Sequence, residues 1–357
     1  MQYFSPRSRE DCIELFKSRR SEEVHILKSV VVAICTTGDR DIIACLQSVE
    51  VQTVPTGWHL LHTLVIVNQA TLDTRLVSKI QAHFPDVVVL QEDRLGIPWA
   101  RNLAQSKALA AGASWVAFLD DDCLADSNWL QELAGQAEAL KSDCVMGEVI
   151  YKPTSRPSSY IPDRKWNTPY FLSEGLVAGQ SLLTAYTHSV LYRPEFYEGQ
   201  TELLEFDVSR SGAGGSDERY FRQFKELGGQ ITFCASSKVI ELYSGERLQL
   251  KWHLLRRLSN ITNHPAGLRV AMKGWVVKRS LSRALSVLLS LPLAPLGLIF
   301  CGVAGSITGS HRLKGLAGSQ LLTLVIPFGA TLRVLGVRYH RYTSKFRYEP
   351  FRRNRII

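Results

Sequence analysis

The 357-residue sequence lacks several patterns that mark common protein classes. Its seven cysteines are scattered, without the C-x-x-C spacing of zinc or redox sites and without the dense framework of disulfide-linked secreted domains. Residues 1–28 are charged and contain no apolar export core, so we expect no secretory signal there. No internal repeat, helix-turn-helix or zinc-finger pattern occurs, and we expect no nucleic-acid partner. These absences favour a protein with reduced cysteines in the cytosol.

Acidic residues are scarce in the last third of the chain. Residues 241–357 contain 19 Lys and Arg but only 3 Asp and Glu, a net charge of +16. Residues 1–240 contain 23 Lys and Arg against 30 Asp and Glu, a net charge of −7. Apolar runs alternate with the basic residues of the rear segment, and this favours an anionic membrane surface over nucleic acid as its partner.

Two long uncharged runs lie in this basic region. The first begins at residue 284 and continues for about 27 residues, enough to cross a bilayer, and the second fills the 18 positions between Lys314 and Arg333. Basic residues flank both runs, so we predict a membrane hairpin at 284–337 whose two ends face the cytoplasm. Two prolines interrupt the first run, so a re-entrant or interfacial helix pair is one alternative and burial in a soluble core is another.

From Ser29 onward, short apolar runs alternate with longer stretches of helical spacing. This pattern is typical of an α/β fold with a mostly parallel sheet flanked by helices, and 45% hydrophobic residues suffice for a large core. Ligands of such sheets collect at the carboxyl ends of the strands, where Thr36, Asn68 and Asp93 fall. The expected strands are 30–35, 63–67, 87–90 and 115–119, and the expected helices are 41–51, 73–84 and 99–110.

The apolar strand expected at 115–119 leads directly into Asp120, Asp121 and Asp122. Three adjacent carboxylates raise one another's pKa values, and a hard divalent cation with oxygen ligands removes that penalty. If the chain stays extended, Asp120 and Asp122 lie on one side and Asp121 on the other, so the outer pair can share a substrate-bound metal. The alternative is a solvated acidic turn that caps the helix near Asn128.

The second half of this region contains further signals. A stretch rich in Pro, Ser and aromatic residues at 151–170 is expected to be an irregular loop on the acceptor side. The glycine-rich run at 212–215 leads into a helix that ends near Leu227. A short strand at 231–234 and a basic helix around 248–260 follow.

Five motifs occur in the order and spacing of one known family. They are Ile34-Cys35-Thr36 with Arg40, G-I-P-W-A-R-N at 96–102, F-L-D-D-D at 118–122, G-G-S-D-E-R-Y-F at 214–221, and Trp252 with Arg256-Arg257. Over residues 28–262 the sequence resembles a family-2 inverting glycosyltransferase of the GT-A fold, and among these the enzymes of succinoglycan-type exopolysaccharide assembly. The implied parts are an extension (1–28), a GT-A domain (29–262), a basic juxtamembrane segment (263–283), the hairpin or re-entrant helices (284–337) and a basic cytoplasmic tail (338–357).

The resemblance implies a role for each candidate residue. A UDP-sugar would be bound by Thr36, Arg40, Asn68, Arg94, Arg101, Asp120 and Asp121. The cofactor, Mg²⁺ or Mn²⁺, would be held by Asp122 and Asp120. The general base would be Asp217. Contacts to the diphosphate or the acceptor would come from Trp252, Arg256 and Arg257.

Each of these roles has a simpler alternative. Arg101 also suits an exposed helix surface, and Asp217 also suits the first turn of a helix as a cap. The basic helix that carries Trp252 also suits an anionic lipid surface. Two histidines near the expected site, His188 and His253, lack ligand-like spacing and are interpreted as structural.

Two positions depart from the family pattern. Ser216 stands where relatives carry a Glu before the base, and Asn68 stands where relatives place an Asp at the end of the second strand. The Gln-x-x-Arg-Trp motif of processive synthases is also absent, because Gln249 and Trp252 are one residue too close. This absence favours transfer of a single sugar over polymerisation.

The sequence therefore predicts an enzyme attached to the cytoplasmic face of the membrane. It would move one sugar, with inversion, to a polyprenyl-diphosphate-linked acceptor, because a membrane-bound acceptor is most concentrated at the bilayer surface. A nucleotidyltransferase of the same fold is one alternative, and the 96–102 segment argues against it. A non-catalytic sugar-nucleotide-binding scaffold is another, and intact Asp122 and Asp217 argue against that.

Overall fold

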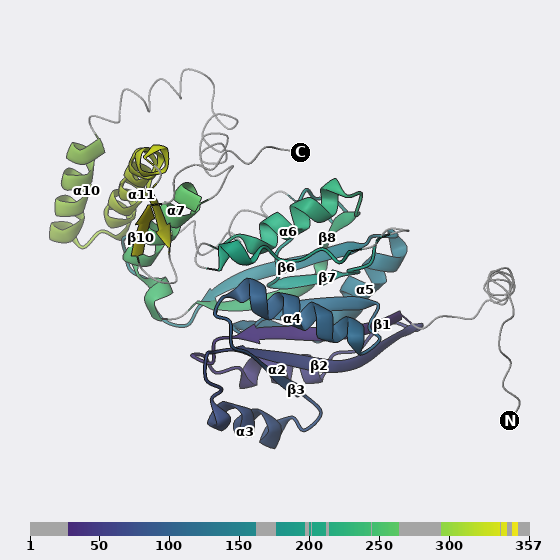
Figure 1. Ribbon diagram of the computed structural model, residues 1–357. Coiled ribbons are helices and arrows are strands. Elements are labelled where there is room, and N and C mark those ends of the chain that lie inside the picture. Colours follow the sequence, from purple (N-terminus) through teal and green to yellow (C-terminus); the bar gives the residue numbers. More distant parts are fainter. Residues whose placement is uncertain are drawn as a thin grey trace, which may run out of the picture.

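The computed structural model of the chain describes residues 28–161, 176–196, 200, 202–211, 214–243, 245–263, 294–335, 337–340 and 345–348 (Figure 1). These residues form one mixed sheet with helices on both faces, together with helices and a two-stranded hairpin that follow it in sequence. Nearly all of the predicted N-terminal extension and of the juxtamembrane segment at 263–283 lies outside the described residues.

The first half of the sheet agrees with the prediction. Four strands pair in parallel in the order β3-β2-β1-β4, so their carboxyl ends lie along one edge. The Val, Ala and Ile residues of β1 are buried on both faces, as a central parallel strand requires. The elements are β1 (Lys28–Thr36), α2 (Ile43–Glu50), β2 (Trp58–Asn68), α3 (Thr74–His83), β3 (Val88–Glu92), α4 (Ile97–Ala110) and β4 (Trp115–Asp120).

The second half corrects the prediction of a mostly parallel sheet. The full order is β3-β2-β1-β4-β7-β6-β8-β5, in which β4–β7, β7–β6 and β8–β5 are antiparallel and β6–β8 is parallel. The strand expected at 231–234 continues to Tyr243, because residues 237–243 alternate between buried and less buried positions instead of forming an apolar run. The elements are β5 (Cys123–Ala125), α5 (Trp129–Ala139), β6 (Cys144–Pro153), β7 (Ser189–Tyr192), α6 (Ser216–Glu226) and β8 (Ile231–Tyr243).

The core consists of two apolar clusters, one on each face of the sheet. Val30, Val32 and Ile34 of β1 point to the cluster that contains residues of α2, α3 and α5. Val31 and Ala33 point to the opposite cluster, which contains residues of α4 and α6. Full burial of one such Val or Ile contributes ~1.5–3 kcal/mol, so both layers hold the strand ends in fixed positions at the edge.

The chain after β8 forms a small helical unit beside the sheet (Figure 1). Helix α11 packs against α7 and α10, and Asn263 Nδ2 at the end of α7 donates to the carbonyl oxygen of Tyr339 at 2.7 Å. Within the described ranges, no helix combines the length and the apolarity that a membrane crossing requires. Residues 284–293 of the predicted hairpin lie outside these ranges. The elements are η3 (Gly245–Leu248), α7 (Leu250–Asn263), α10 (Ala294–Thr308), α11 (His311–Val334), β9 (Val337–His340) and β10 (Lys345–Tyr348).

Candidate active site

The three aspartates lie at the carboxyl edge of the sheet, where β4 gives way to a two-residue turn before β5. Asp121 accepts hydrogen bonds from Thr36 Oγ1 at 2.7 Å and from Arg40 Nη1 at 3.0 Å. The expected alternation of sides is wrong beyond Asp120, because the strand ends there and the turn brings Asp121 and Asp122 to the same guanidinium. The solvated-turn alternative is wrong as well, since both side chains are less than 10% exposed.

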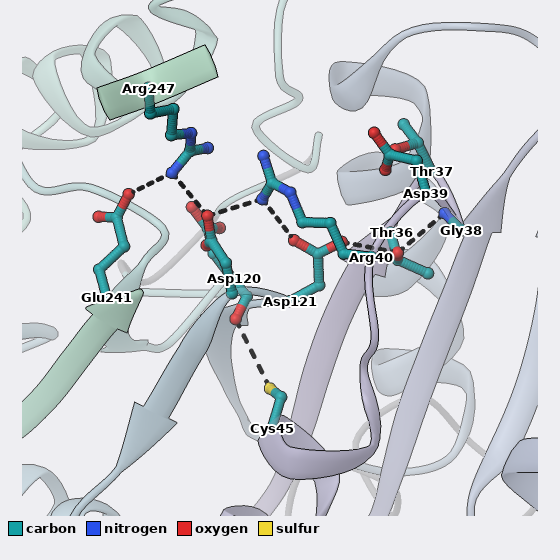
Figure 2. A network of polar contacts seen from close by, with 11 residues as sticks. Thr36, Thr37, Gly38, Asp39, Arg40, Cys45, Asp120, Asp121, Glu241 and Arg247 are labelled. Atoms are coloured by element: carbon teal, nitrogen blue, oxygen red, sulfur yellow. Dashed lines mark hydrogen bonds and ion pairs between the residues drawn. The ribbon is translucent and has the colours of Figure 1, made fainter. Parts of the chain in front are cut away.

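Asp122 joins two arginines to a buried glutamate. Its Oδ2 accepts from Arg40 Nη1 at 2.7 Å and from Arg247 Nη1 at 2.6 Å, and the same Arg247 nitrogen donates to Glu241 Oε1 at 2.7 Å. Figure 2 shows Arg247 reaching Glu241 from one side while Arg40 reaches Asp121 from the other. The two guanidinium groups supply counter-charge to these adjacent carboxylates.

Asp120 has no such partner. Its backbone oxygen accepts from Cys45 Sγ at 3.6 Å, but its carboxylate accepts no hydrogen bond from any residue that the structure describes. Burial raises the pKa of Asp120 to about 6, and the nearby carboxylates of Asp122 and Asp217 add to the rise, while Arg101 opposes it. Asp120, Asp121, Asp122 and Glu241 form the acidic corner of the site, and within it burial makes ionisation of Asp120 unfavourable.

The unfavourable ionisation of buried Asp120 is expected to affect the stability of the folded protein. Because the folded-state pKa of Asp120 lies above its unfolded value, ionisation opposes folding; the cost is absent below about pH 4 and full above about pH 6. Asp120→Asn is expected to stabilise the metal-free, donor-free protein at pH 8 by about 1–3 kcal/mol, with a smaller gain at pH 5. Urea unfolding at both pH values measures this, with exposed Asp86→Asn as the control. Equal stability of Asp120→Asn and wild type at pH 8 would contradict the electrostatic account.

Arg101 lies in the wall of the site that faces Asp120. It is 7% exposed, so the alternative of an exposed surface arginine is wrong. Its Nη1 donates to Ser216 Oγ at 3.0 Å, its Nη2 donates to Thr187 Oγ1, and its guanidinium carbon lies 5.6 Å from the centre of the Phe206 ring. A buried guanidinium whose hydrogen bonds go to neutral hydroxyls keeps its charge available for an anion.

Asp217 is the second residue of α6, which begins after Gly214 and Gly215 in positive-φ conformations (79° and 73°). Its Oδ1 accepts from the backbone N–H of Glu218 at 2.9 Å, so it also serves the helix turn, as the simpler alternative expected. Its charge raises the pKa values of both Asp120 and His188. The fold therefore brings Asp217 to the acidic corner.

His188 also faces this corner. Burial lowers its pKa to about 4, although the charges of Asp217 and Asp122 raise it, and its ring stacks on Tyr186 at 5.6 Å. His253 has a structural contact, with its Nε2 3.0 Å from the carbonyl oxygen of Arg247.

Two residues predicted to bind the nucleotide, Asn68 and Arg94, lie near the carboxyl ends of β2 and β3 and not at the acidic corner. Asn68 bonds the turn after β3, with its Nδ2 donating to the carbonyl oxygens of Glu92 (3.0 Å) and Arg94 (2.9 Å) and its Oδ1 accepting from the N–H of Gly96 (2.8 Å). Arg94 makes two 2.7 Å bonds to Glu92 and lies 4.0 Å from the Trp99 ring centre. Neither residue contacts the acidic corner within the described chain, so their role in binding a nucleotide stays a prediction.

The residues of α7 border the site on its other side. The guanidinium carbon of Arg256 lies 4.9 Å from the Trp252 ring centre, and that of Arg247 lies 5.8 Å from the same ring. The charge of Arg256 lowers the pKa values of Glu241 and His188, so this arginine is near the corner. Arg257 is the next residue of α7 and is half-buried.

Sequence reasoning missed Arg247 and Glu241. Glu241 lies in a strand where positions 237, 239, 241 and 243 are buried, so a two-residue period would have placed a carboxylate on the inner face. Its neighbour across the sheet is Cys123, one residue after the aspartate turn. Arg247 carries no local signal, because its role depends on the 3₁₀ turn that follows β8.

Asp120 and Asp122 fit a divalent cation as two oxygen ligands. Asp120 is buried without a hydrogen bond from the described residues, and burial raises its pKa, so a hard cation would stabilise its ionised form. The described part of the chain contains no group of three or more His, Cys, Asp or Glu side chains that could hold a metal ion. A cation at this pair therefore needs further oxygens from a bound phosphate.

Comparison with known proteins identifies the fold. Residues 29–199 match the family described as Glycosyl transferase family 2. Over this region, just under half of the chain, the sequence is similar to family 2 glycosyltransferases, the family that the motifs resemble. The chain is 26% identical over 239 residues to the succinoglycan biosynthesis protein ExoM of Rhizobium meliloti (strain 1021), covering 65% of this chain and 73% of that protein.

The solved structures that match the chain include S. aureus TarS 1-349 in complex with UDP, at 15% identity and a TM-score of 0.45, covering 92% of this chain and 97% of that one. GalNAc-T7 with UDP, GalNAc and Mn²⁺ matches at 17% identity and a TM-score of 0.45, covering 70% of this chain. The chain spans 51% of that GalNAc-T7 structure.

Proposed function

We propose that this glycosyltransferase moves a single sugar from a UDP-sugar to a lipid-linked oligosaccharide at the cytoplasmic face of the membrane, with inversion and with a divalent cation. The proposal is supported by the position of α6: Ser216, the residue before Asp217, accepts from Arg101 Nη1 at 3.0 Å, and the charge of Asp217 contributes to the raised pKa of Asp120. The relative in succinoglycan biosynthesis supports a place in exopolysaccharide or cell-surface glycan assembly.

Asp217 accepts the proton in this mechanism. The acceptor hydroxyl attacks the anomeric carbon on the face opposite the departing diphosphate, which inverts the centre, and its proton passes to the Asp217 carboxylate. Gly215 in the left-handed region places this carboxylate on the first turn of α6, where the Glu218 N–H fixes one oxygen. The other oxygen accepts no hydrogen bond from the described residues.

Positive charge stabilises the departing diphosphate. A divalent cation, which Asp120 and Asp122 would hold, would supply part of this charge. Arg101 supplies another part, because its hydrogen bonds go to Ser216 and Thr187 and no carboxylate neutralises it through them. The Ser at position 216 thus changes the wall of the site, since a Glu there would pair with this guanidinium.

The helical unit gives the proposed membrane contact. Ile299, Val303 and Ile307 follow one another at four-residue intervals on α10 and are 61%, 54% and 80% exposed. Residues spaced in this way share one helix face. An exposed apolar stripe in the strongly basic part of the chain suits the surface of an anionic bilayer, where α10 would lie in the interfacial plane.

Replacing this stripe is expected to release the protein from vesicles. The triple variant Ile299→Ser, Val303→Ser, Ile307→Ser should lose affinity for anionic vesicles by about tenfold or more, because three apolar anchors are removed. Co-sedimentation with phosphatidylglycerol vesicles measures it. The matched control replaces three similarly exposed apolar residues outside the helical unit, Val51, Val177 and Leu183, with Ser. Equal losses in both variants would contradict a specific role of α10.

The activity itself is tested with membranes that contain lipid-linked acceptors. Candidate UDP-sugars are added with and without a chelator, and labelled lipid and released nucleotide are measured. The proposal predicts labelled lipid together with UDP, and only without the chelator. Release of pyrophosphate would indicate a nucleotidyltransferase, and donor binding without turnover would indicate a scaffold.

A further inference from the structure

Arg247 occupies an unusual position in the acidic corner. One nitrogen, Nη1, lies 2.6 Å from Asp122 Oδ2 and 2.7 Å from Glu241 Oε1, and the side chain is 21% exposed. Asp122 is the carboxylate expected to hold the donor's cation. A guanidinium therefore lies against the carboxylate where positive charge is needed once the donor is bound.

A divalent ion and this guanidinium compete for one carboxylate. Because Arg247 Nη1 lies 2.6 Å from Asp122 Oδ2, an ion bound by Asp122 would be close to this guanidinium, and two neighbouring cations would repel each other in a partly buried site. Each arginine has a second carboxylate partner, Asp121 for Arg40 and Glu241 for Arg247. The two differ in position, because Arg40 follows β1 and its partner Asp121 also accepts from Thr36, whereas Arg247 comes from the short turn η3, which begins at Gly245 with a positive φ of 54°.

We propose that Arg247 is an exchangeable counter-ion of the donor site. It neutralises Asp122 and Glu241 while the site is empty, leaves Asp122 when the donor arrives with its cation, and then pairs with the donor's diphosphate. A planar guanidinium suits that second role because it donates two parallel hydrogen bonds to phosphate oxygens. The inference rests on the proposed function and adds an order of events: the cation binds with the donor, not before it.

Mn²⁺ binding to the whole protein tests this role without measuring catalysis. In titrations followed by electron paramagnetic resonance, Arg247→Met is expected to bind Mn²⁺ about tenfold or more tightly than wild type when no UDP is present. With UDP present, the same variant is expected to bind Mn²⁺ and UDP about tenfold more weakly, because the diphosphate loses a bidentate partner. A purely structural role of Arg247 would not produce these opposite changes.

Two further variants complete the test. Arg247→Lys keeps the charge and is expected to keep Mn²⁺ out of the UDP-free site, while losing part of the UDP affinity. Arg193→Met removes an arginine that pairs with Asp143 at 2.5 Å, next to the start of β6, and is expected to change neither affinity. Thermal unfolding checks that each variant is folded.

The outcomes separate the inference from the function on which it rests. If wild type transfers sugar with Mn²⁺ but Arg247→Met binds UDP-free Mn²⁺ no better than wild type, the counter-ion role is wrong. If wild type binds neither UDP nor Mn²⁺ and transfers no sugar, the proposed function is wrong.

Discussion

Asp217→Asn is expected to lower the rate of sugar transfer about a thousandfold while UDP affinity stays within about twofold of wild type. The Asn side chain has the same shape, and its oxygen still accepts from the Glu218 N–H, so α6 keeps its first turn. What it loses is the ability to take the proton of the acceptor hydroxyl. Turnover at saturating donor and acceptor, with UDP calorimetry beside it, measures both quantities.

The matched control is Glu226→Gln, an exposed acidic residue at the other end of the same helix. It should leave transfer unchanged. If Asp217→Asn kept wild-type turnover, another group would have to accept the proton. Glu218, the next residue of α6, would then be the first carboxylate to replace.

Asp122→Asn is expected to weaken the joint binding of UDP and Mn²⁺ by about a hundredfold, since it removes the charge of a metal ligand. Asn is preferred to Ala here because Asp122 Oδ2 accepts from both Arg40 and Arg247. Removing that acceptor altogether would leave Arg40 with Asp121 alone and Arg247 with Glu241 alone, and would destabilise the fold by about 1–3 kcal/mol.

Calorimetric titration of UDP in the presence of Mn²⁺ measures the effect of Asp122→Asn, and urea unfolding confirms that the variant is folded. Asp126→Asn, four residues further along and exposed, serves as the control. An unchanged affinity in Asp122→Asn would place the cation elsewhere.

The sequence was sufficient to predict the edge of the sheet where the site forms. Four apolar runs with helices between them predict parallel strands, and parallel strands end at one edge, where Thr36 and the aspartates lie. The antiparallel half was not predicted, because β7 pairs with β4 across more than 60 residues and no local pattern records that pairing.

The ion pairs within the site could not be predicted from local sequence patterns either. The motif predicted that Asp120, Asp122 and Asp217 would matter, but which arginine pairs with which carboxylate depends on the packing of distant segments. Arg101 illustrates this, since its guanidinium is buried by contacts with Thr187, Phe206 and Ser216, which are distant in sequence. Arg247 was missed because the turn that carries it follows a strand whose length the apolar pattern underestimated.

The central claim is that the acidic corner after β4 binds the donor's diphosphate through a divalent cation. The most direct measurement titrates UDP into protein stripped of divalent ions, and then repeats the titration after Mn²⁺ is restored. We predict weak or undetectable binding in the stripped protein and full recovery with Mn²⁺. Equal UDP affinity in both titrations would contradict the account.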